Sequence, residues 1–291
     1  MSHTFVLLSI LLCCSIGINH YKLRNCHAAF QSTIGIISKF EKMKCQLCDK
    51  GKKLIKAYIF PEFLYKDLSL YSSDKKGQGS IRGVRNTGGK IEFLRKGLPL
   101  GLYDSTILCK DCDSITLKEF DDFGKLMFTG LIKERGEKIE LKSSEFIEIE
   151  VLDYFQLKAF IASLFWRASI SKRPEFSIVK LMELESKLNK LFKEKDTAIL
   201  KEFEIVILYL NNGLTDDYLC NIVEVNKLNT YFYSFIAGGF LINLFPDTNK
   251  IFEIWRQFVV KEEKTFKIPI INDIETSKYI INSFIDKEVL K

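Results

Sequence analysis

The spacing of hydrophobic and polar positions changes partway along the second half of the chain. Between residues 153 and 171, and again between 176 and 192, apolar side chains recur every three or four positions, which predicts two helices. Asp153 stands where the first helix needs an N-cap, and Pro174 follows the end of that helix. Beyond residue 200 the apolar runs become β-branched and aromatic and are bounded by Asn, Gly, Asp and Pro, which predicts strands.

Four runs carry this strand signature, and they read FEIVILYL, LCNIVEV, TYFYSFIAGGFLINLF and KTFKIPII. Gly238 and Gly239 interrupt the third run and predict a bulge or a tight bend there. Helices followed by strands indicate an α+β domain with an antiparallel sheet, which we expect to span residues 131–291. The charged segment KERGEKIELKSSEFIEIEV alternates apolar and polar residues and predicts a connecting strand pair at the start of this domain.

Two residues of the first predicted helix, Trp166 and Arg167, each allow two interpretations. We expect Trp166 to lie in the core and Arg167 to pair with a carboxylate. The alternative is that these side chains contact a substrate or a nucleic acid. Either role needs a partner that the local pattern does not identify.

Shorter elements are expected between residues 43 and 130. The run KKLIKAYIFPEFLY alternates apolar residues at Ile55, Ala57 and Ile59 before Pro61, which predicts a strand entering a hairpin. The later run DSITLKEFDDFGKLMF has the spacing of a helix. The apolar residues placed near one face of that helix are Ile115, Phe120, Phe123 and Met127.

Two Cys-x-x-Cys pairs, CQLC at Cys45 and Cys48 and CKDC at Cys109 and Cys112, frame this segment. Two such pairs supply the four soft ligands that tetrahedral structural zinc takes at about 2.3 Å. Redox-active or disulfide-bonded pairs are the alternative, and they need a secreted protein or a thioredoxin-type context that is not evident around Cys45. The pattern therefore predicts structural zinc in the reducing cytoplasm. A pair of cysteines, a hairpin, and a helix that starts at the second pair follow one another in the order of a treble clef.

Charge identifies only one local feature. The 47% hydrophobic chain carries a formal charge of +6, and residues 43–291 hold 39 basic against 36 acidic residues. A zinc ion with four thiolates contributes two negative charges, so no global field favours nucleic acid. The segment SDKKGQGSIRGVRNTGGKIEFLRKG, by contrast, has seven basic residues and two acids.

This glycine-rich basic segment has two interpretations. Its backbone could approach phosphates while the cationic side chains engage their charge, as contacts to DNA or RNA require. The residues that would make those contacts are Arg82, Arg85, Lys90, Arg95 and Lys96. The alternative is a solvated flexible loop.

Residues 1–42 are expected to form an N-terminal extension, with the working protein beginning at Met43. The apolar stretch from Phe5 to Gly17 is too short to span a bilayer. It has the length of a signal-peptide core, but no Lys or Arg precedes it and no A-x-A-like cleavage site follows. A signal or membrane anchor and an ordinary buried helix are the alternatives, and a membrane partner is expected only if the segment is an anchor.

The motifs CQLC, LIKAYIFPEFLY and YDSTILCKDCD, taken together, resemble the uncharacterised bacterial proteins related to HNH endonucleases. The pattern of that group runs Cys-x-x-Cys, then a (S/A)HIIP element, then LLCxxC(D/E). The resemblance implies a treble-clef fold and a structural zinc on Cys45, Cys48, Cys109 and Cys112. It also implies an ancestral metal-dependent nuclease.

The chain departs from this family at the residue that performs its chemistry. An active HNH site uses a hairpin His to polarise water, and further side chains hold a divalent cation such as magnesium. Tyr58 occupies the His position here, and a phenol with a pKa near 10 is a poor general base. Asp113 is the one acid placed to hold a cation, and residues 43–291 contain no His. Tyr58 could act as a nucleophile only with surrounding cations.

These observations lead to one principal hypothesis and two alternatives. The principal hypothesis is an N-terminal treble-clef zinc module, residues 43–130, followed by the α+β domain, in a catalytically degenerate HNH-like protein. We expect it to bind nucleic acid or another partner, and family analogy suggests bacterial defence. One alternative is a metal-dependent nuclease with a nonstandard base, for which Tyr58 and Asp113 are the candidates. The other is a scaffold without nucleic-acid contact.

Overall fold

The computed structural model describes most of the chain from Met43 onward. Its described ranges are 43–66, 71–72, 80–81, 84–87, 90–93, 101–140, 145–150, 153–211, 219–227, 230–263, 265–273, 275–276 and 280. Two compact units are present, Met1–Met43 and Lys44–Lys291, and the second is described below. The expected extension at residues 1–42 lies outside the described ranges. Within those ranges, no helix combines the length and the apolar character needed to cross a bilayer.

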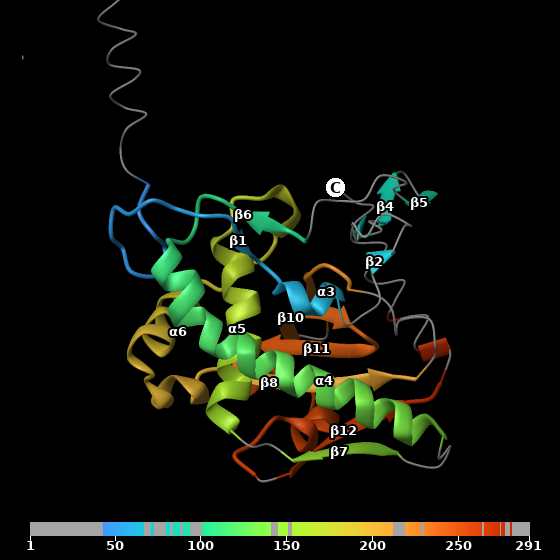
Figure 1. Cartoon of the computed structure of the whole chain (residues 1–291). Helices are drawn as coiled ribbons and strands as arrows, with labels where there is room; N and C mark the ends of the chain where they lie inside the picture. The colour runs from blue at the N-terminus through green and yellow to red at the C-terminus, as the bar shows by residue number, and fades with distance from the viewer. Residues whose placement is uncertain are drawn as a thin grey trace, which may run out of the picture. The chain divides into compact units, whose positions relative to one another are not determined.

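A six-stranded sheet is the largest element of the second unit (Figure 1). Its order is β7-β12-β8-β11-β10-β9. The strands are β7 (Phe146–Glu150), β8 (Glu204–Leu210), β9 (Val223–Lys227), β10 (Thr230–Ala237), β11 (Phe240–Phe245) and β12 (Thr265–Ile271). The mixed α+β class is therefore confirmed. The expectation of a wholly antiparallel sheet was wrong, because β12 runs antiparallel to β7 but parallel to β8. The strand β11 is antiparallel to β8. The next strand in the chain, β12, runs opposite to β11 and pairs with the other edge of β8, so β12 and β8 are parallel.

The two glycines in the third predicted strand run form a tight turn. Gly238 and Gly239 have φ values of 58° and 82°, and Ala237 pairs directly with Phe240. A two-residue loop with positive φ at both positions matches the right-handed twist of the strands that it joins. The expected bend is confirmed as the hairpin turn between β10 and β11.

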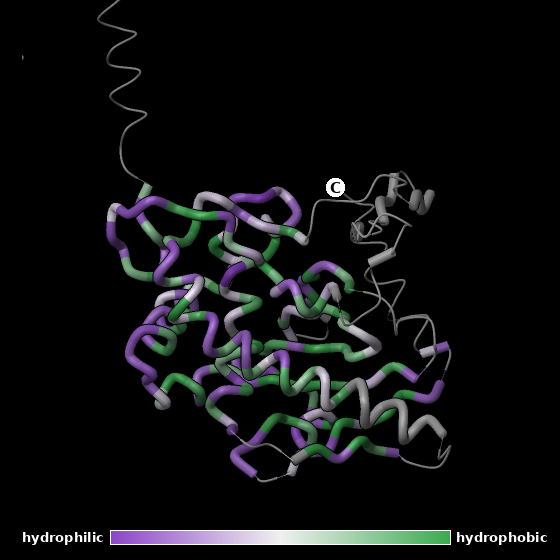
Figure 2. Tube along the Cα trace, in the orientation of Figure 1, coloured by the Kyte–Doolittle hydropathy of each residue, from purple (hydrophilic) through white to green (hydrophobic). Residues whose placement is uncertain are grey.

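The helix α5 (Tyr154–Ile170) is buried on all sides along most of its length. Every residue from Leu157 to Ala168 is buried. Asp153 caps the helix as expected, because its carboxylate accepts a hydrogen bond from the backbone N–H of Gln156 at 3.0 Å. The helices α4 (Lys118–Glu140) and α6 (Glu183–Glu194) pack against α5. A helix that is apolar all round belongs in the interior, and Figure 2 shows hydrophobic residues following the strands beside it.

Two helix boundaries differ from those expected. The helix α4 continues to Glu140, so the first part of the predicted connecting strand pair was wrong and only β7 forms there. The expected boundary between the two domains, at residue 130, lies inside α4. One hydrophobic core includes residues from both sides of this position. The helix α6 begins at Glu183 rather than near residue 176. Pro174–Phe176 forms a separate 3-10 turn, and Met182 has φ 51°, which no α-helix adopts.

A two-stranded ribbon precedes α4. It pairs β1 (Ala57–Tyr58) with β6 (Tyr103–Asp104) in antiparallel register, so the partner of β1 comes after a long intervening segment. That segment contains α3 (Glu62–Lys66) and four short strands. These are β2 (Tyr71–Ser72), β3 (Ser80–Ile81), β4 (Val84–Thr87) and β5 (Lys90–Phe93).

The helix at the second cysteine pair opens with a π-helical turn, Cys112–Leu117. Such a turn is wider than an α-helical one and shifts the angular position of the residues that it contains. Ile115 is therefore 69% exposed, and its expected place on the apolar face was wrong. The buried residues of this face are Leu117, Phe120 and Phe128, and Phe123 is partly buried against them.

Two charged side chains are buried in α5, one near each end. Lys158 near the start donates to the carboxylate of Glu204 at 3.0 Å. Arg167 near the end donates to both oxygens of Asp121 at 2.9 and 2.8 Å. Both α5 side chains are 1% exposed. The expectation that Trp166 is core and that Arg167 pairs with a carboxylate is confirmed, since Trp166 is fully buried.

The contribution of the buried Arg167–Asp121 ion pair to stability can be compared with that of the exposed Lys118–Asp122 pair. Asp121→Asn leaves the guanidinium of Arg167 buried without a counter-charge, and we expect it to lower the free energy of unfolding by about 3 kcal/mol. Asp122→Asn is the control, because the Lys118–Asp122 pair is 56% and 63% exposed. Its effect should stay below about 0.5 kcal/mol. Urea denaturation followed by circular dichroism measures both, and equal losses would contradict the assigned roles.

Two glycines of α4 make a second matched pair. A Cβ at Gly124 would lie 2.4 Å from the ring of Phe160, whereas a Cβ at Gly130 would meet nothing within 4 Å. Gly124→Ala should therefore lower the free energy of unfolding by about 1–3 kcal/mol through overpacking. Gly130→Ala should raise it by about 0.5–1 kcal/mol, because alanine favours the helix. The same denaturation assay applies, and stabilisation by both changes would refute the close contact of α4 with α5.

Candidate metal centre

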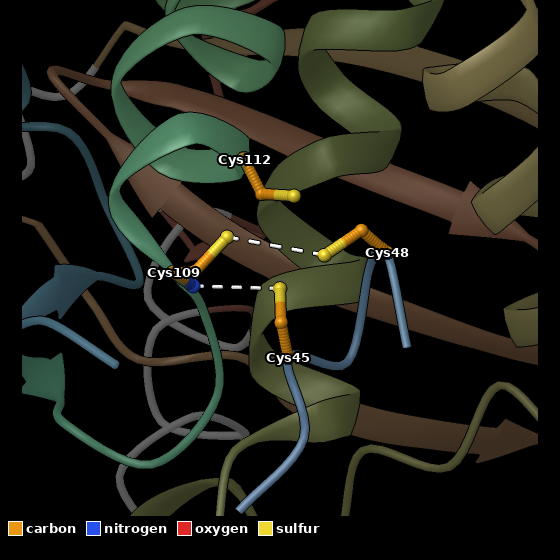
Figure 3. Close-up of side chains that lie close together, drawn as sticks. All are labelled: Cys45, Cys48, Cys109 and Cys112. Atoms are coloured by element: carbon orange, nitrogen blue, oxygen red, sulfur yellow. Dashed lines mark hydrogen bonds between the residues drawn. The ribbon is translucent and has the colours of Figure 1, made fainter. Parts of the chain in front are cut away.

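The four paired cysteines converge on one point of the fold. The Sγ atoms of Cys45, Cys48, Cys109 and Cys112 all lie within 4.8 Å of one another, and those of Cys48 and Cys109 are 3.9 Å apart (Figure 3). Four sulfurs at about 2.3 Å from a tetrahedral ion are about 3.8 Å from each other. All four cysteines are free thiols, and all except Cys48 are buried. The cluster could therefore hold a thiophilic metal ion such as zinc.

Backbone hydrogen bonds place the first cysteine pair in a tight loop. The N–H of Asp49 donates to the carbonyl of Cys45 at 2.8 Å, and the N–H of Cys45 donates to the carbonyl of Lys50 at 3.1 Å. Asp49 adopts a left-handed φ of 55°, which lets the chain reverse immediately after the pair. The N–H of Gln46 donates to the carbonyl of Ile107 at 2.8 Å and joins this loop to the segment before the second pair.

The second pair stands at the beginning of a helix. The N–H of Asp113 donates to the carbonyl of Cys109 at 3.0 Å, which starts the helical ladder. The N–H of Cys109 also points at the sulfur of Cys45, 3.4 Å away (Figure 3). A helix N-terminus favours negative charge, so this end of the helix supports thiolate ligands.

The thiols influence the ionisation of one another. Burial acts to raise the pKa of Cys45, but the backbone N–H groups of Cys48, Cys109 and Leu47 outweigh it and lower that pKa to about 7. Burial raises the pKa of Cys109 and Cys112, and the neighbouring Cys45 raises both further. Four thiolates cannot coexist here without a cation to offset their charge. A divalent metal ion supplies that charge and deprotonates its thiol ligands outright.

An exposed lysine–aspartate pair lies beside the cluster. Lys52 pairs with Asp111 at 2.6 Å, and this hydrogen bond raises the pKa of Lys52. The same bond lowers the pKa of Asp111, with further lowering from Lys110 and Lys50. Lys52 also lies close enough to interact with the charges of Cys48 and Cys109, so it would offset part of the negative charge of a divalent ion with four thiolates.

Tyr58, the first catalytic candidate, packs within the β1–β6 ribbon. Its ring lies edge-on to the ring of Tyr103 with centroids 6.4 Å apart, and the residue is half-buried. Gly101 (φ 74°) approaches so closely that a Cβ there would lie 3.1 Å from the Tyr58 ring and 2.7 Å from the Tyr65 ring. These contacts give the Tyr58 ring a packing role.

Asp113, the second candidate, lies near charged residues of the interior. Burial raises the pKa of its carboxyl, the guanidinium of Arg167 opposes this, and the carboxylate of Asp121 adds to it. Asp113 therefore shares the electrostatic environment of the Arg167–Asp121 pair.

The predicted nucleic-acid contacts fall on the segment before β6. Arg82, Arg95 and Lys96 lie outside the described residues. Arg85 lies in β4 and Lys90 in β5, where the backbone pairs Arg85 with Glu92 and Thr87 with Lys90. The side chains of these strands are also outside the described part, so contact with nucleic acid stays a prediction.

Asp104 is a structurally important residue that sequence reasoning missed. It is buried, and one oxygen accepts from the N–H and hydroxyl of Thr106 at 2.8 and 2.7 Å. The other accepts from the hydroxyl of Ser171 at 2.9 Å and the N–H of Lys172 at 2.8 Å. Burial acts to raise the pKa of Asp104, but these hydrogen bonds lower it overall. The signal in the sequence is Asp-Ser-Thr, because Asp accepts from the backbone two residues on in an Asx-turn.

The chain matches no family model, no curated protein and no solved structure in the comparisons.

The metal site is tested by comparing a cysteine of the cluster with a cysteine outside it. We expect the full-length protein to retain about one metal ion per chain after dialysis, as a four-thiolate site requires. Cys109→Ser should lose most of that metal and unfold at lower temperature, because binding energy at such a site is folding energy. Cys220→Ser, outside the cluster, should keep the metal. Elemental analysis by mass spectrometry reads the result, and undiminished metal in Cys109→Ser would disprove the site.

Proposed function

We propose that this chain is a zinc-stabilised, treble-clef protein of HNH-like descent that binds nucleic acid without cleaving it by the HNH mechanism. The observation that carries the zinc-stabilised part of the proposal is the convergence of the four cysteine sulfurs. The four sulfurs could fill every ligand position of a tetrahedral ion, and a structural zinc site is closed in this way while a catalytic one keeps an open position. A closed site would hold the fold together without itself binding an attacking water, and Tyr58 in the position of the hairpin His speaks against HNH cleavage.

The order of elements supports the treble-clef description. A cysteine loop leads to β1, β1 pairs with β6, and the second cysteine pair opens the helix that follows. Tyr58 stands in β1, where the related nucleases carry their hairpin His. The packing of the Tyr58 ring argues against hydrolytic chemistry at this ribbon.

Exposed lysines beside the cluster support a nucleic-acid partner. Lys50, Lys53 and Lys110 are exposed and have no ion-pair partner among the described residues. Lys56 lies over the ring of Tyr103 at 4.9 Å from its centroid. Cations next to an aromatic ring suit the backbone and bases of a single strand. The basic segment that contains Arg82 and Arg85 precedes Tyr103 in the sequence and supplies further cations.

The proposal is tested by binding of fluorescein-labelled DNA and RNA oligonucleotides to the full-length chain at several salt concentrations. We expect affinity to fall steeply with salt, with a slope that grows by about 0.7 for each phosphate engaged on a single strand. Replacing Arg82 and Arg85 by Ala should weaken binding and reduce the slope. The control replaces Lys190 and Lys193 of α6, which are exposed and carry the same charge.

Two outcomes would contradict the proposal in different ways. Absence of binding at low salt would favour a scaffolding protein without nucleic-acid contact. Cleavage of plasmid or RNA in magnesium or manganese that disappears in Asp113→Ala would instead establish the metal-dependent nuclease. We expect no cleavage, and equal binding by Asp113→Ala and the wild-type chain.

A further inference from the structure

One of the four clustered cysteines is more accessible than the other three. Cys45, Cys109 and Cys112 are buried, whereas Cys48 is half-buried at the end of the first cysteine loop. The sulfur of Cys45 is also occupied, because it accepts a hydrogen bond from the backbone N–H of Cys109 at 3.4 Å. A small reagent that approaches the cluster from solvent therefore meets the sulfur of Cys48 first.

The sulfur of Cys109 lies opposite that of Cys48. The two sulfur atoms are 3.9 Å apart and point toward each other (Figure 3). They belong to different cysteine pairs, one in the loop before β1 and the other at the start of the helix that leads into α4. A disulfide bond is about 2.05 Å long, so the two sulfurs would have to approach one another by about 2 Å to form one. A metal ion held between them prevents that approach while it is bound.

A positive charge lies beside these two sulfurs. Lys52 is exposed, its ammonium pairs with Asp111 at 2.6 Å, and it interacts electrostatically with both Cys48 and Cys109. Reactive cysteines occupy electropositive, partly exposed surroundings, and redox-sensing cysteines also have a second cysteine within reach. Cys48 combines the three features, with Lys52 as the charge and Cys109 as the second cysteine.

We propose that Cys48 and Cys109 form a redox switch, in which hydrogen peroxide converts their two thiolates into a disulfide and the bound metal ion is released. This inference rests on the zinc-stabilised part of the proposed function and concerns the regulation of that site. The disulfide would join the first cysteine loop to the start of the helix, as the metal ion does. The two segments would thus stay connected after the ion has left, which makes the change reversible by reduction.

The oxidation takes place in two steps. The thiolate of Cys48 attacks one oxygen of hydrogen peroxide, the O–O bond breaks, and hydroxide leaves, which gives a sulfenic acid at Cys48. The thiolate of Cys109 then attacks the sulfur of Cys48, the S–O bond breaks, and a second hydroxide leaves. The two sulfurs lose two electrons and the peroxide gains them, and two protons from solvent convert the hydroxides into water. With two of its four ligands gone, the ion leaves as the hydrated dication.

The switch is tested on the full-length, zinc-loaded protein treated with an excess of hydrogen peroxide. We expect release of about one zinc ion per chain, measured by the absorbance of a pyridylazo-resorcinol chelator. Trypsin cleaves the chain at Lys110, so Cys109 and Cys112 fall in different peptides. Mass spectrometry should find CQLCDK joined to GLPLGLYDSTILCK, and fragmentation should place the bond at Cys48. Dithiothreitol and added zinc should then restore the metal.

The outcomes separate the switch from the metal site itself. A chain purified without metal would contradict the zinc-stabilised part of the proposed function, and the switch with it. A zinc-loaded chain that keeps its metal in excess peroxide would overturn the switch alone. Loss of zinc without a disulfide between Cys48 and Cys109, or with a disulfide inside one Cys-x-x-Cys pair, would also overturn it.

Lys52→Gln tests the neighbouring charge without removing a metal ligand. The ammonium of Lys52 stabilises the hydroxide that leaves the peroxide, so we expect its loss to slow zinc release by about threefold. Lys53→Gln is the matched control, because it removes the same charge one residue further on and should release zinc at the wild-type rate. Both lysines are exposed, so both variants should fold and bind zinc, which thermal unfolding and elemental analysis check. Equal slowing in the two variants would contradict the role assigned to Lys52.

Discussion

The complete burial of α5 is the constraint on which the rest of the structure depends. A helix surrounded by protein must neutralise every charge that it carries, because an unpaired buried ion costs several kcal/mol. Lys158 and Arg167 are those charges, and each finds its carboxylate on a different element. Glu204 belongs to the sheet and Asp121 to α4, so the two ion pairs fix α5 between them.

The cysteine cluster is tied to this central helix by two routes. Cys112 lies in the helical turn that leads into α4, which carries Asp121, and Asp104 joins the segment before the cluster to the end of α5. Metal binding would thus hold both attachment points at once, and the free energy of metal binding would contribute to the stability of the core. A metal ion bound here would serve a structural purpose, and residues 43–291 contain no His that could act beside it.

The sequence was most informative where one residue type serves one physical need. The cap at Asp153 and the turn at the two glycines between β10 and β11 follow from local geometry, and the convergence of the paired cysteines follows from the four ligands that a tetrahedral ion needs. The errors occurred where distant packing decides. The π-helical turn that exposes Ile115 follows from no local pattern, and the parallel pairing of β12 with β8 depends on the path of the whole chain. The carboxylate partners of Lys158 and Arg167 are likewise 46 residues away from them.

The central claim is that four sulfur atoms, and no other ligands, hold one metal ion. X-ray absorption spectroscopy of the metal in the purified full-length protein tests it most directly. The account predicts a single shell of four sulfur atoms at about 2.3 Å from zinc. A shell that contains oxygen or nitrogen would show an open or mixed site, and would contradict both the closed cluster and the non-catalytic role assigned to it.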